Sequence, residues 1–209
     1  MKLYLSLKKL SSTRGSIVTV KKNTFLGLGK FPDNIQEALI EAQHLISCSI
    51  PPHLWENMTL TADHNLHITL KYMGYQTRFD VSDIDAHLKN SRFKSFPLTL
   101  GKIGYFQVKN QTYIWAGVKH SDALISFQNN LDKVVQQHLG MPLKGTFTPH
   151  ITLMRLKHAS EEDIAYIMQN LPHVPALTFT APKYYLYQTE NDANGHKVYL
   201  PEERYSFAS

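Results

Sequence analysis

Cysteine is almost absent from this sequence. The single Cys48 in 209 residues cannot form a disulfide within the chain, so no internal disulfide framework holds the fold together. Cys48 stands at the end of a helical pattern and lacks the His and Asp company that activates a nucleophilic thiol. We interpret it as an inert thiol.

Long apolar runs are also lacking. No stretch approaches the 18 or so apolar residues of a membrane span, and Lys2, Lys8 and Lys9 interrupt the first ten residues before a signal-peptide core could form. We therefore expect a cytoplasmic protein with no membrane association. At 43% hydrophobic residues, the chain still has enough apolar side chains for a substantial core.

Charge is not gathered into blocks of one sign. The formal net charge is +5 and the pI is about 9.1, but Lys and Arg are spread along the whole chain. Such a balance slightly favours polyanionic partners such as nucleotides or RNA, and many soluble proteins share it. Charge alone therefore does not identify a function.

Two familiar catalytic patterns are missing. His64 and His67 would point to opposite faces of a strand, and neither a Cys pair nor a His-Glu helix supplies the other ligands of a zinc site. The Gly-x-Ser-x-Gly elbow of a Ser-His-Asp hydrolase is absent as well. We therefore expect no metal and no cofactor.

The sequence does contain one four-residue motif twice, His67-Ile68-Thr69-Leu70 and His150-Ile151-Thr152-Leu153. With 11 His and 15 Thr, a bare His-x-Thr should occur about once by chance. Here both copies carry the same Ile and Leu and lie in apolar, strand-like stretches. Residues i and i+2 of a strand share a face, so each copy presents an imidazole beside a hydroxyl. The alternative is that these are ordinary half-buried histidines in strands. That alternative explains a single copy of the motif well, but it explains two matched copies poorly.

Strands and helices mix in both halves of the chain. Periodicity and turn residues predict strands at 24–29, 58–61, 66–72, 96–106, 112–118, 147–154, 177–180, 184–188 and 196–200, and helices at 33–47, 82–90, 122–139 and 161–171.

Each half places one motif strand shortly before a short helix, which indicates a diverged internal duplication. We predict an α+β fold of two pseudo-symmetric lobes, with antiparallel sheets lining a central cleft, the motif strands facing each other across it, and helices outside. Residues 1–23 form an N-terminal extension or an extra strand, and residues 24–209 form a single two-lobed domain.

Two imidazoles opposed across a cleft suit phosphodiester cleavage without a metal. Since His titrates near neutral pH, one ring can accept a proton from an attacking water while the other donates a proton to the departing oxygen. Each Thr hydroxyl can donate a hydrogen bond to a nonbridging phosphate oxygen. The residues alone do not tell which histidine donates.

The flanks of the motifs, Leu66-His-Ile-Thr-Leu-Lys-Tyr-Met-Gly74 and Phe147-Thr-Pro-His-Ile-Thr-Leu-Met-Arg155, resemble those of the two-histidine (2H) phosphoesterases, most closely the LigT-like RNA 2′,3′-cyclic phosphodiesterases, once called 2′-5′ RNA ligases. The resemblance covers roughly residues 24–200. It implies a two-lobed fold with a central cleft, no required metal, and hydrolysis of a 2′,3′-cyclic phosphate to a 2′-phosphate end. His67 would be the proton donor to the leaving 3′ oxygen, His150 the acceptor from water, and Thr69 and Thr152 would contact the phosphate.

Further residues gain a possible role from the same resemblance. Arg155 matches the family's Arg after the second motif and could hold phosphate, although strict alternation would turn it away from His150. Lys71 shares the face of His67 and Thr69 and could add positive charge at the cleft rim. For both, a solvated surface residue is the alternative.

Tyr105, Phe106 and Trp115 lie where the family has an aromatic residue that can stack on a base, an interaction worth about 1–3 kcal/mol. Aromatic residues in strands more often belong to the core. We assign Trp115 to the core and keep Tyr105 and Phe106 as candidates for substrate binding.

The leading hypothesis is thus an RNA 2′,3′-cyclic phosphodiesterase that acts as a monomer on RNA ends or a small nucleotide. A second keeps the chemistry and changes the substrate to 2′-5′-linked oligoadenylates or cyclic oligonucleotide signals. A third is a non-catalytic nucleotide-binding or RNA-binding module that kept the cleft.

Overall fold

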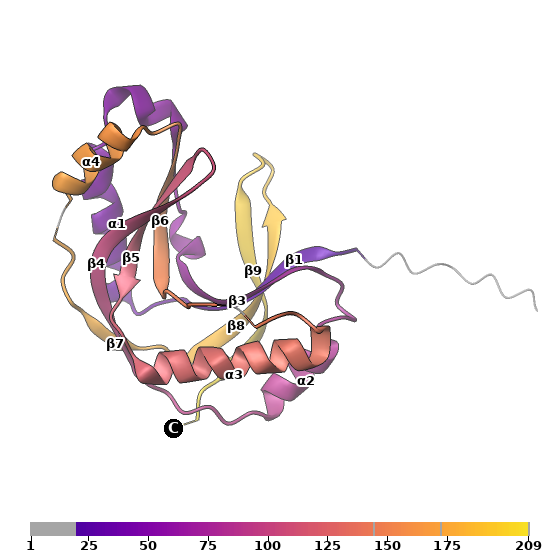
Figure 1. Cartoon of the computed structure of the whole chain (residues 1–209). Coiled ribbons are helices and arrows are strands. Elements are labelled where there is room, and N and C mark those ends of the chain that lie inside the picture. Colours follow the sequence, from indigo (N-terminus) through magenta and orange to yellow (C-terminus); the bar gives the residue numbers. More distant parts are fainter. Residues whose placement is uncertain (1–19, 144, 172, 209) are drawn as a thin grey trace, which may run out of the picture.

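The computed structural model describes residues 20–143, 145–171 and 173–208, which form an α+β fold as predicted (Figure 1). Its strands are β1 (Lys22–Gly29), β2 (Met58–Leu60), β3 (His67–Gln76), β4 (Pro97–Val108), β5 (Gln111–Val118), β6 (His150–Lys157), β7 (Thr178–Thr180), β8 (Lys183–Asn191) and β9 (Lys197–Ser206). Its helices are α1 (Asp33–Cys48), α2 (Ser82–Asn90), α3 (Asp122–Leu139) and α4 (Glu161–Gln169), with short 3-10 turns at η1 (Pro52–Asn57) and η2 (Asp63–Asn65).

Every strand and helix predicted from the sequence is present. The main differences are longer strands: β3 and β9 continue past residues 72 and 200, and β1 begins at Lys22, within the predicted N-terminal segment 1–23. Residues 1–19, which make up most of the segment expected to form an N-terminal extension or an extra strand, lie outside the described residues. No helix within the described residues is long and apolar enough to cross a membrane.

The helices begin and end where their sequences dictate. Ser121 caps α3 by accepting a hydrogen bond from the Leu124 backbone N–H (3.3 Å), and Gly140 ends the helix in the left-handed region at φ 63°. At α4, Ser160 and Asp163 form a reciprocal capping box. These caps fix the two helices independently of the sheet.

All strands belong to one antiparallel sheet in the order β7-β4-β5-β6-β3-β1-β8-β9, with β2 also paired to β6. The helices cover its outer side in two groups (Figure 1). α1 follows β1 in the chain but packs against β6, whereas α3 follows β5 but packs against β3. Each half of the molecule therefore supplies the helix that covers the motif strand of the other half.

The two motif strands lie side by side in the middle of the sheet. They are paired at one position, where Ile68 lies opposite Ile151. We expected these strands to face each other across a cleft. The structure instead joins them edge to edge. Both isoleucines are fully buried in the main hydrophobic core, which runs under both halves.

Each motif strand contains a β-bulge directly after its His-Ile-Thr triplet. In β3, Thr69 pairs with Gly27 but Lys71 pairs with Leu26, so Leu70 is an extra residue. In β6, Thr152 pairs with Trp115 but Met154 pairs with Ile114, so Leu153 is extra. A bulge of this kind reverses the alternation of the side chains that follow it, in β3 as far as a second bulge at Met73.

Two glutamines bind the backbone at the bulges. The Gln43 amide, from α1, donates to the Leu153 carbonyl (2.7 Å) and the Thr61 carbonyl (2.8 Å). The Gln128 amide, from α3, donates to the Leu70 carbonyl (3.3 Å). Both side chains are buried, with 3% and 2% of their surface exposed. A buried glutamine thus donates to the bulge carbonyl in each half, and at Leu153 it adds to the hydrogen bond from the Thr61 backbone N–H (2.8 Å).

We expect Gln43→Leu to lower the free energy of unfolding by about 1–3 kcal/mol, because the Thr61 carbonyl would lose the Gln43 amide and the Leu153 carbonyl would keep only the Thr61 backbone N–H (2.8 Å) as donor. Urea unfolding followed by circular dichroism measures this loss. Gln36→Leu is the matched control, since Gln36 is also on α1 and donates to a backbone carbonyl, that of Asp63, but at an exposed site. Equal losses in the two variants would contradict the role given to the bulge.

Candidate active site

The register of the two motif strands assembles four polar side chains on one face. With Ile68 opposite Ile151, His67 lies opposite Thr152 and Thr69 lies opposite His150. The isoleucines point into the core, so alternation turns the other four side chains to the face away from the helices. The two histidines are then diagonal neighbours, about 7–8 Å apart with their Cβ atoms somewhat closer. The structure therefore brings all four motif residues together.

The two imidazole rings are oriented in the same way. The Nδ1–H of His67 donates to the Asn65 carbonyl (2.7 Å), and the Nδ1–H of His150 donates to the Thr148 carbonyl (2.8 Å). A carbonyl only accepts hydrogen bonds, so Nδ1 carries hydrogen in both rings. The reactive nitrogen is therefore Nε2, which in His67 lies 3.0 Å from the Thr69 hydroxyl.

Aromatic rings enclose His67. The rings of Phe25 and Tyr199 each lie 4.8 Å from it and that of Tyr187 lies 6.2 Å away. The pKa of His67 is lowered to about 4, mainly by burial and to a smaller extent by the positive charges of His150 and Arg155, against the opposing effect of the Asn65 carbonyl. Without a ligand, His67 is thus neutral at pH 7.

His150 is flanked by Phe106 at 5.2 Å and Trp115 at 5.8 Å, measured between ring centres. Trp115 was assigned to the core, which is wrong: it lies on the site face, in the same register row as Thr152, and outside the buried clusters. Room for its ring comes from Gly104 on β4, where a Cβ would lie 2.3 Å from the indole.

The two aromatic candidates on β4, Tyr105 and Phe106, lie on opposite faces of the sheet. Phe106 pairs with Tyr113 and reaches His150, so it lies on the site face. Tyr105 pairs with the buried Ile114 and therefore points to the opposite face. Phe106 remains a candidate for base stacking, whereas Tyr105 does not.

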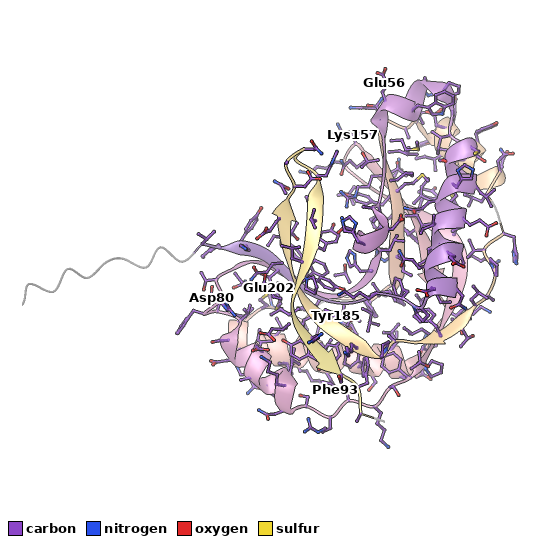
Figure 2. All side chains as sticks on the ribbon, turned by 180° about the vertical axis from the view of Figure 1, so that it is seen from behind. Glu56, Asp80, Phe93, Lys157, Tyr185 and Glu202 are labelled. Carbon is purple, nitrogen blue, oxygen red and sulfur yellow. The ribbon has the colours of Figure 1, made fainter. Side chains whose placement is uncertain are left out.

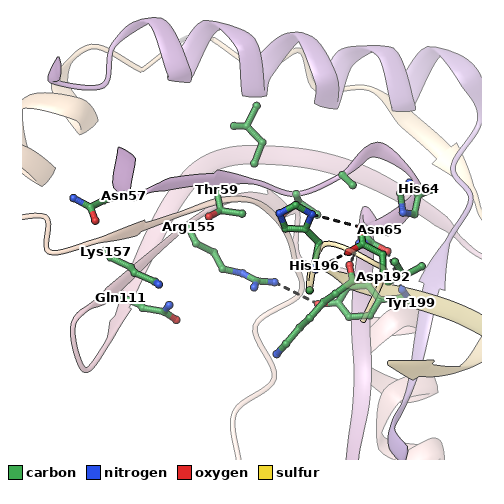
Figure 3. A pocket seen from close by; sticks show the side chains of 16 residues that line it. Asn57, Thr59, His64, Asn65, Gln111, Arg155, Lys157, Asp192, His196 and Tyr199 are labelled. Atoms are coloured by element: carbon green, nitrogen blue, oxygen red, sulfur yellow. Dashed lines mark hydrogen bonds and ion pairs between the residues drawn. The ribbon is translucent and has the colours of Figure 1, made fainter. Parts of the chain in front are cut away.

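Arg155 reaches the site face because of the bulge at Leu153. Strict alternation would have turned it away, but the extra residue places it opposite Tyr113, with the guanidinium 5.8 Å from the Tyr113 ring. Its Nη2 also donates to the Tyr199 hydroxyl at 3.3 Å (Figure 3). The guanidinium therefore extends from β6 toward β9, next to the histidines.

Lys71 does not lie at the cleft rim, contrary to our prediction. The bulge at Leu70 turns it to the helix side, where only 3% of its surface is exposed. There its ammonium group forms an ion pair with Asp132 of α3 (2.8 Å) and donates to the Pro142 carbonyl (3.3 Å). Lys71 therefore ties α3 to β3 and does not contact a ligand on the site face.

Two residues at the site were not anticipated from the sequence. The Asn65 carbonyl orients His67, while its buried side chain donates to the Lys197 carbonyl (2.6 Å) and accepts from the Tyr199 backbone N–H (2.9 Å). Asn65 thus fixes the β8–β9 hairpin, and with it Tyr199, beside His67. For Asn65 the only signal was its place two residues before the histidine, which Thr148 matches in the second motif. For Tyr199 the sequence offers none.

Metal ligands are not grouped in this structure. Among residues 20–143, 145–171 and 173–208, no three His, Cys, Asp or Glu side chains come together in a way that could hold a metal ion. The motif residues and Arg155 supply this face with two imidazoles, two threonine hydroxyls and one guanidinium.

Known proteins share both the sequence pattern and the fold. A protein from Thermotoga maritima named RNA 2′,3′-cyclic phosphodiesterase is 32% identical over 103 residues, which cover 48% of this chain and 54% of that protein. A protein of the same name from Aeropyrum pernix is 28% identical over 109 residues, covering 51% and 62%. The chain thus spans less than two thirds of these relatives.

Among solved structures, E. coli LigT complexed with 3′-AMP matches 91% of this chain and 100% of its own, at a TM-score of 0.68 and 23% identity. A Thermus thermophilus protein matches 88% and 97%, at a TM-score of 0.66 and 23% identity. These likenesses support the two-half fold.

A family model described as the 2′-5′ RNA ligase superfamily matches residues 31–193, a range that includes both motifs. The chain therefore belongs to the 2′-5′ RNA ligase superfamily of two-histidine phosphoesterases.

Proposed function

We propose that this protein is a phosphodiesterase that hydrolyses the 2′,3′-cyclic phosphate at RNA ends to a 2′-phosphate, with His67, Thr69, His150 and Thr152 at the reacting phosphate. The observation that carries the proposal is the crossed placement of the two His-Thr pairs about the Ile68–Ile151 bridge. The names of the curated relatives support the choice of reaction.

In this reaction a water oxygen attacks phosphorus and the bond from phosphorus to the 3′ oxygen breaks. Nε2 of His150 takes a proton from the water, and Nε2 of His67 gives a proton to the 3′ oxygen. The register makes the two histidines diagonal neighbours, which suits a donor and an acceptor on opposite sides of one phosphate. After each turnover His67 has lost a proton and His150 has gained one, and proton exchange with solvent restores both histidines to their starting states.

The remaining polar groups hold negative charge. The Thr69 and Thr152 hydroxyls can each donate to a nonbridging phosphate oxygen, and Arg155 brings a fixed positive charge to the same face. Phe106, in contact with His150, offers a half-exposed ring on which a base can stack.

The low pKa of His67 has to be overcome before this ring can donate. Burial keeps it neutral in the free protein, but an anionic phosphate against Nε2 favours the charged form. Substrate binding and protonation of His67 are thus coupled: the ligand that needs the proton also raises the pKa of the group that gives it.

We expect His67→Ala and His150→Ala each to lower kcat for a 2′,3′-cyclic nucleotide by about 10²–10⁴-fold, and Thr69→Val or Thr152→Val by about 10²–10³-fold. Steady-state kinetics measures the losses, and circular dichroism checks that each variant folds. His44→Ala is the control, because His44 is exposed on α1. Full activity in either site histidine variant would exclude the mechanism.

The donor and the acceptor can be told apart with an aryl phosphodiester whose leaving group departs without a proton. We expect this substrate to restore most of the activity lost in His67→Ala and little of that lost in His150→Ala, because only His67 serves the leaving oxygen. Restoration in His150→Ala instead would reverse the two roles.

Treatment with a chelator should leave kcat and KM unchanged, since side chains perform each proton transfer and hold the phosphate charge in this mechanism. The measurement compares the protein before and after incubation with EDTA and gel filtration, on a 2′,3′-cyclic nucleotide, a 2′-5′ dinucleotide and a cyclic dinucleotide. Higher kcat/KM for the 2′-5′ dinucleotide or the cyclic dinucleotide would identify that compound as the preferred substrate class. Tight binding of these compounds without turnover would indicate a non-catalytic binding module.

The lowered pKa of His67 also predicts how stability depends on pH. Between about pH 6.5 and 4 the unfolded chain takes up a proton at His67 that the folded protein does not, so the free energy of unfolding should fall as pH falls through this range. His67→Asn should flatten this dependence in urea titrations, and His44→Asn should not. Parallel curves for His67→Asn and the unchanged protein would contradict the burial of this ring.

A further inference from the structure

A cavity of about 490 Å³ adjoins the paired histidines (Figure 3). Its floor is formed by β2, β5 and β6, and its wall by η2 and the tip of the β8–β9 hairpin. Figure 2 shows Lys157 at the same end of the molecule as that hairpin tip. Arg155 and Tyr199 belong to the lining, whereas His67 and His150 lie outside it.

Arg155 and Tyr199 form the boundary between the histidines and this cavity. The Tyr199 ring packs edge-on against His67 at 4.8 Å, and its hydroxyl accepts the hydrogen bond from Arg155. Beyond the bulge, alternation along β6 places Lys157 on the same face as Arg155. A chain that leaves the histidines along β6 therefore meets Arg155 first and Lys157 next.

The cavity carries net positive charge. Its lining holds three cations, Arg155, Lys157 and Lys197, and one carboxylate, that of Asp192. With the lining residues His64 and His196 counted as uncharged, the formal charge is three minus one, or +2. Asp192 is occupied by the turn, because it accepts from the Asn194 and His196 backbone N–H groups (both 2.8 Å). Among the described residues, none of the three cations has a carboxylate within ion-pair distance.

A neutral donor, Gln111, accompanies Lys157. Gln111 lies directly opposite Lys157 on β5. Its side-chain oxygen Oε1 accepts a hydrogen bond from the Tyr113 hydroxyl (2.8 Å), which leaves the side-chain N–H₂ to donate elsewhere. Figure 3 shows Gln111 and Lys157 next to each other at the cavity edge. A second cavity of about 570 Å³ shares both residues and continues past them to Lys109 and His158. The positive surface therefore continues past the first cavity to Lys109.

We propose that Lys157 and Gln111 bind the phosphodiester that precedes the terminal nucleoside of an RNA strand, so that the protein acts on RNA 3′ ends in preference to free cyclic nucleotides. The inference rests on the proposed function, since it takes the cyclic phosphate to lie between the histidines. In an RNA with a 2′,3′-cyclic end, the rest of the strand joins the terminal nucleoside through its 5′ oxygen. The second phosphate is thus the one that an ammonium and an amide would hold as the strand passes along β6.

The test compares three substrates: a cyclic mononucleotide, the dinucleotide that ends in the same cyclic nucleotide, and that dinucleotide with an uncharged methylphosphonate linkage. With the unchanged protein we expect kcat/KM to be about 5–10-fold higher for the charged dinucleotide than for the other two, mainly through KM. Lys157→Gln should remove this advantage and change the cyclic mononucleotide by less than about twofold.

Lys133→Gln serves as the matched control, because Lys133 is an exposed lysine on α3, away from both cavities. The slope of log kcat/KM against log salt for the charged dinucleotide should become shallower by about 0.7 in Lys157→Gln and stay unchanged in Lys133→Gln. This is the change in salt slope expected when one phosphate contact to a single-stranded nucleic acid is lost.

Three results would overturn the subsite while leaving the proposed function intact. They are equal kcat/KM for the dinucleotide and the mononucleotide, equal use of the charged and uncharged linkages, and an equal loss on all substrates in Lys157→Gln. Failure to hydrolyse any of the three substrates would instead refute the proposed function, and the subsite with it.

Discussion

The single pairing of Ile68 with Ile151 is the constraint on which both the fold and the site depend. It is the one pairing between the two motif strands, and it fixes which of their residues face the core. Because strand side chains alternate, burying these isoleucines on the helix side turns both His-Thr pairs to the open side. A slip of one residue would bury the imidazoles and expose the isoleucines. Selection for a stable core thus also maintains the geometry of the histidines.

The bulges at Leu70 and Leu153 then decide which charges surround those histidines. The extra residue shifts Lys71 and its counterpart Met154 into the core, and brings Tyr72 and its counterpart Arg155 to the site side. The backbone is nearly symmetric in this respect, down to the glutamines that bind the two bulge carbonyls. The side chains are not symmetric: one half places a guanidinium beside the histidines where the other places a tyrosine. Positive charge therefore lies on one side of the two histidines, along β6, so the site is not symmetric in charge.

The sequence predicted well what is set locally. The helix stripes and caps placed α1 to α4, and the doubled motif identified the four residues that the register brings together. Strict alternation gives the wrong face for Lys71 and also for Arg155, which was kept as a candidate on the resemblance alone. A bulge depends on the partner strand, with which Leu70 or Leu153 fails to pair, and not on the residues beside it. Trp115 was misplaced because its room comes from Gly104 on a neighbouring strand. Asn65 and Tyr199 meet only through a hairpin more than a hundred residues further along the chain. Contacts of this kind are decided by tertiary structure.

The different surroundings of the two histidines bear on their division of labour in the proposed reaction. His67 is enclosed by Phe25, Tyr187 and Tyr199, whereas His150 is flanked by the half-exposed rings of Phe106 and Trp115. An acceptor must receive water from solvent, which the less enclosed position of His150 permits. A donor must keep its proton for the leaving oxygen, and an enclosed ring that is charged only when phosphate is bound meets that need. The aromatic enclosure that lowers the pKa of free His67 therefore also makes its protonation specific to the complex, because an anion at the site is what restores the charged form.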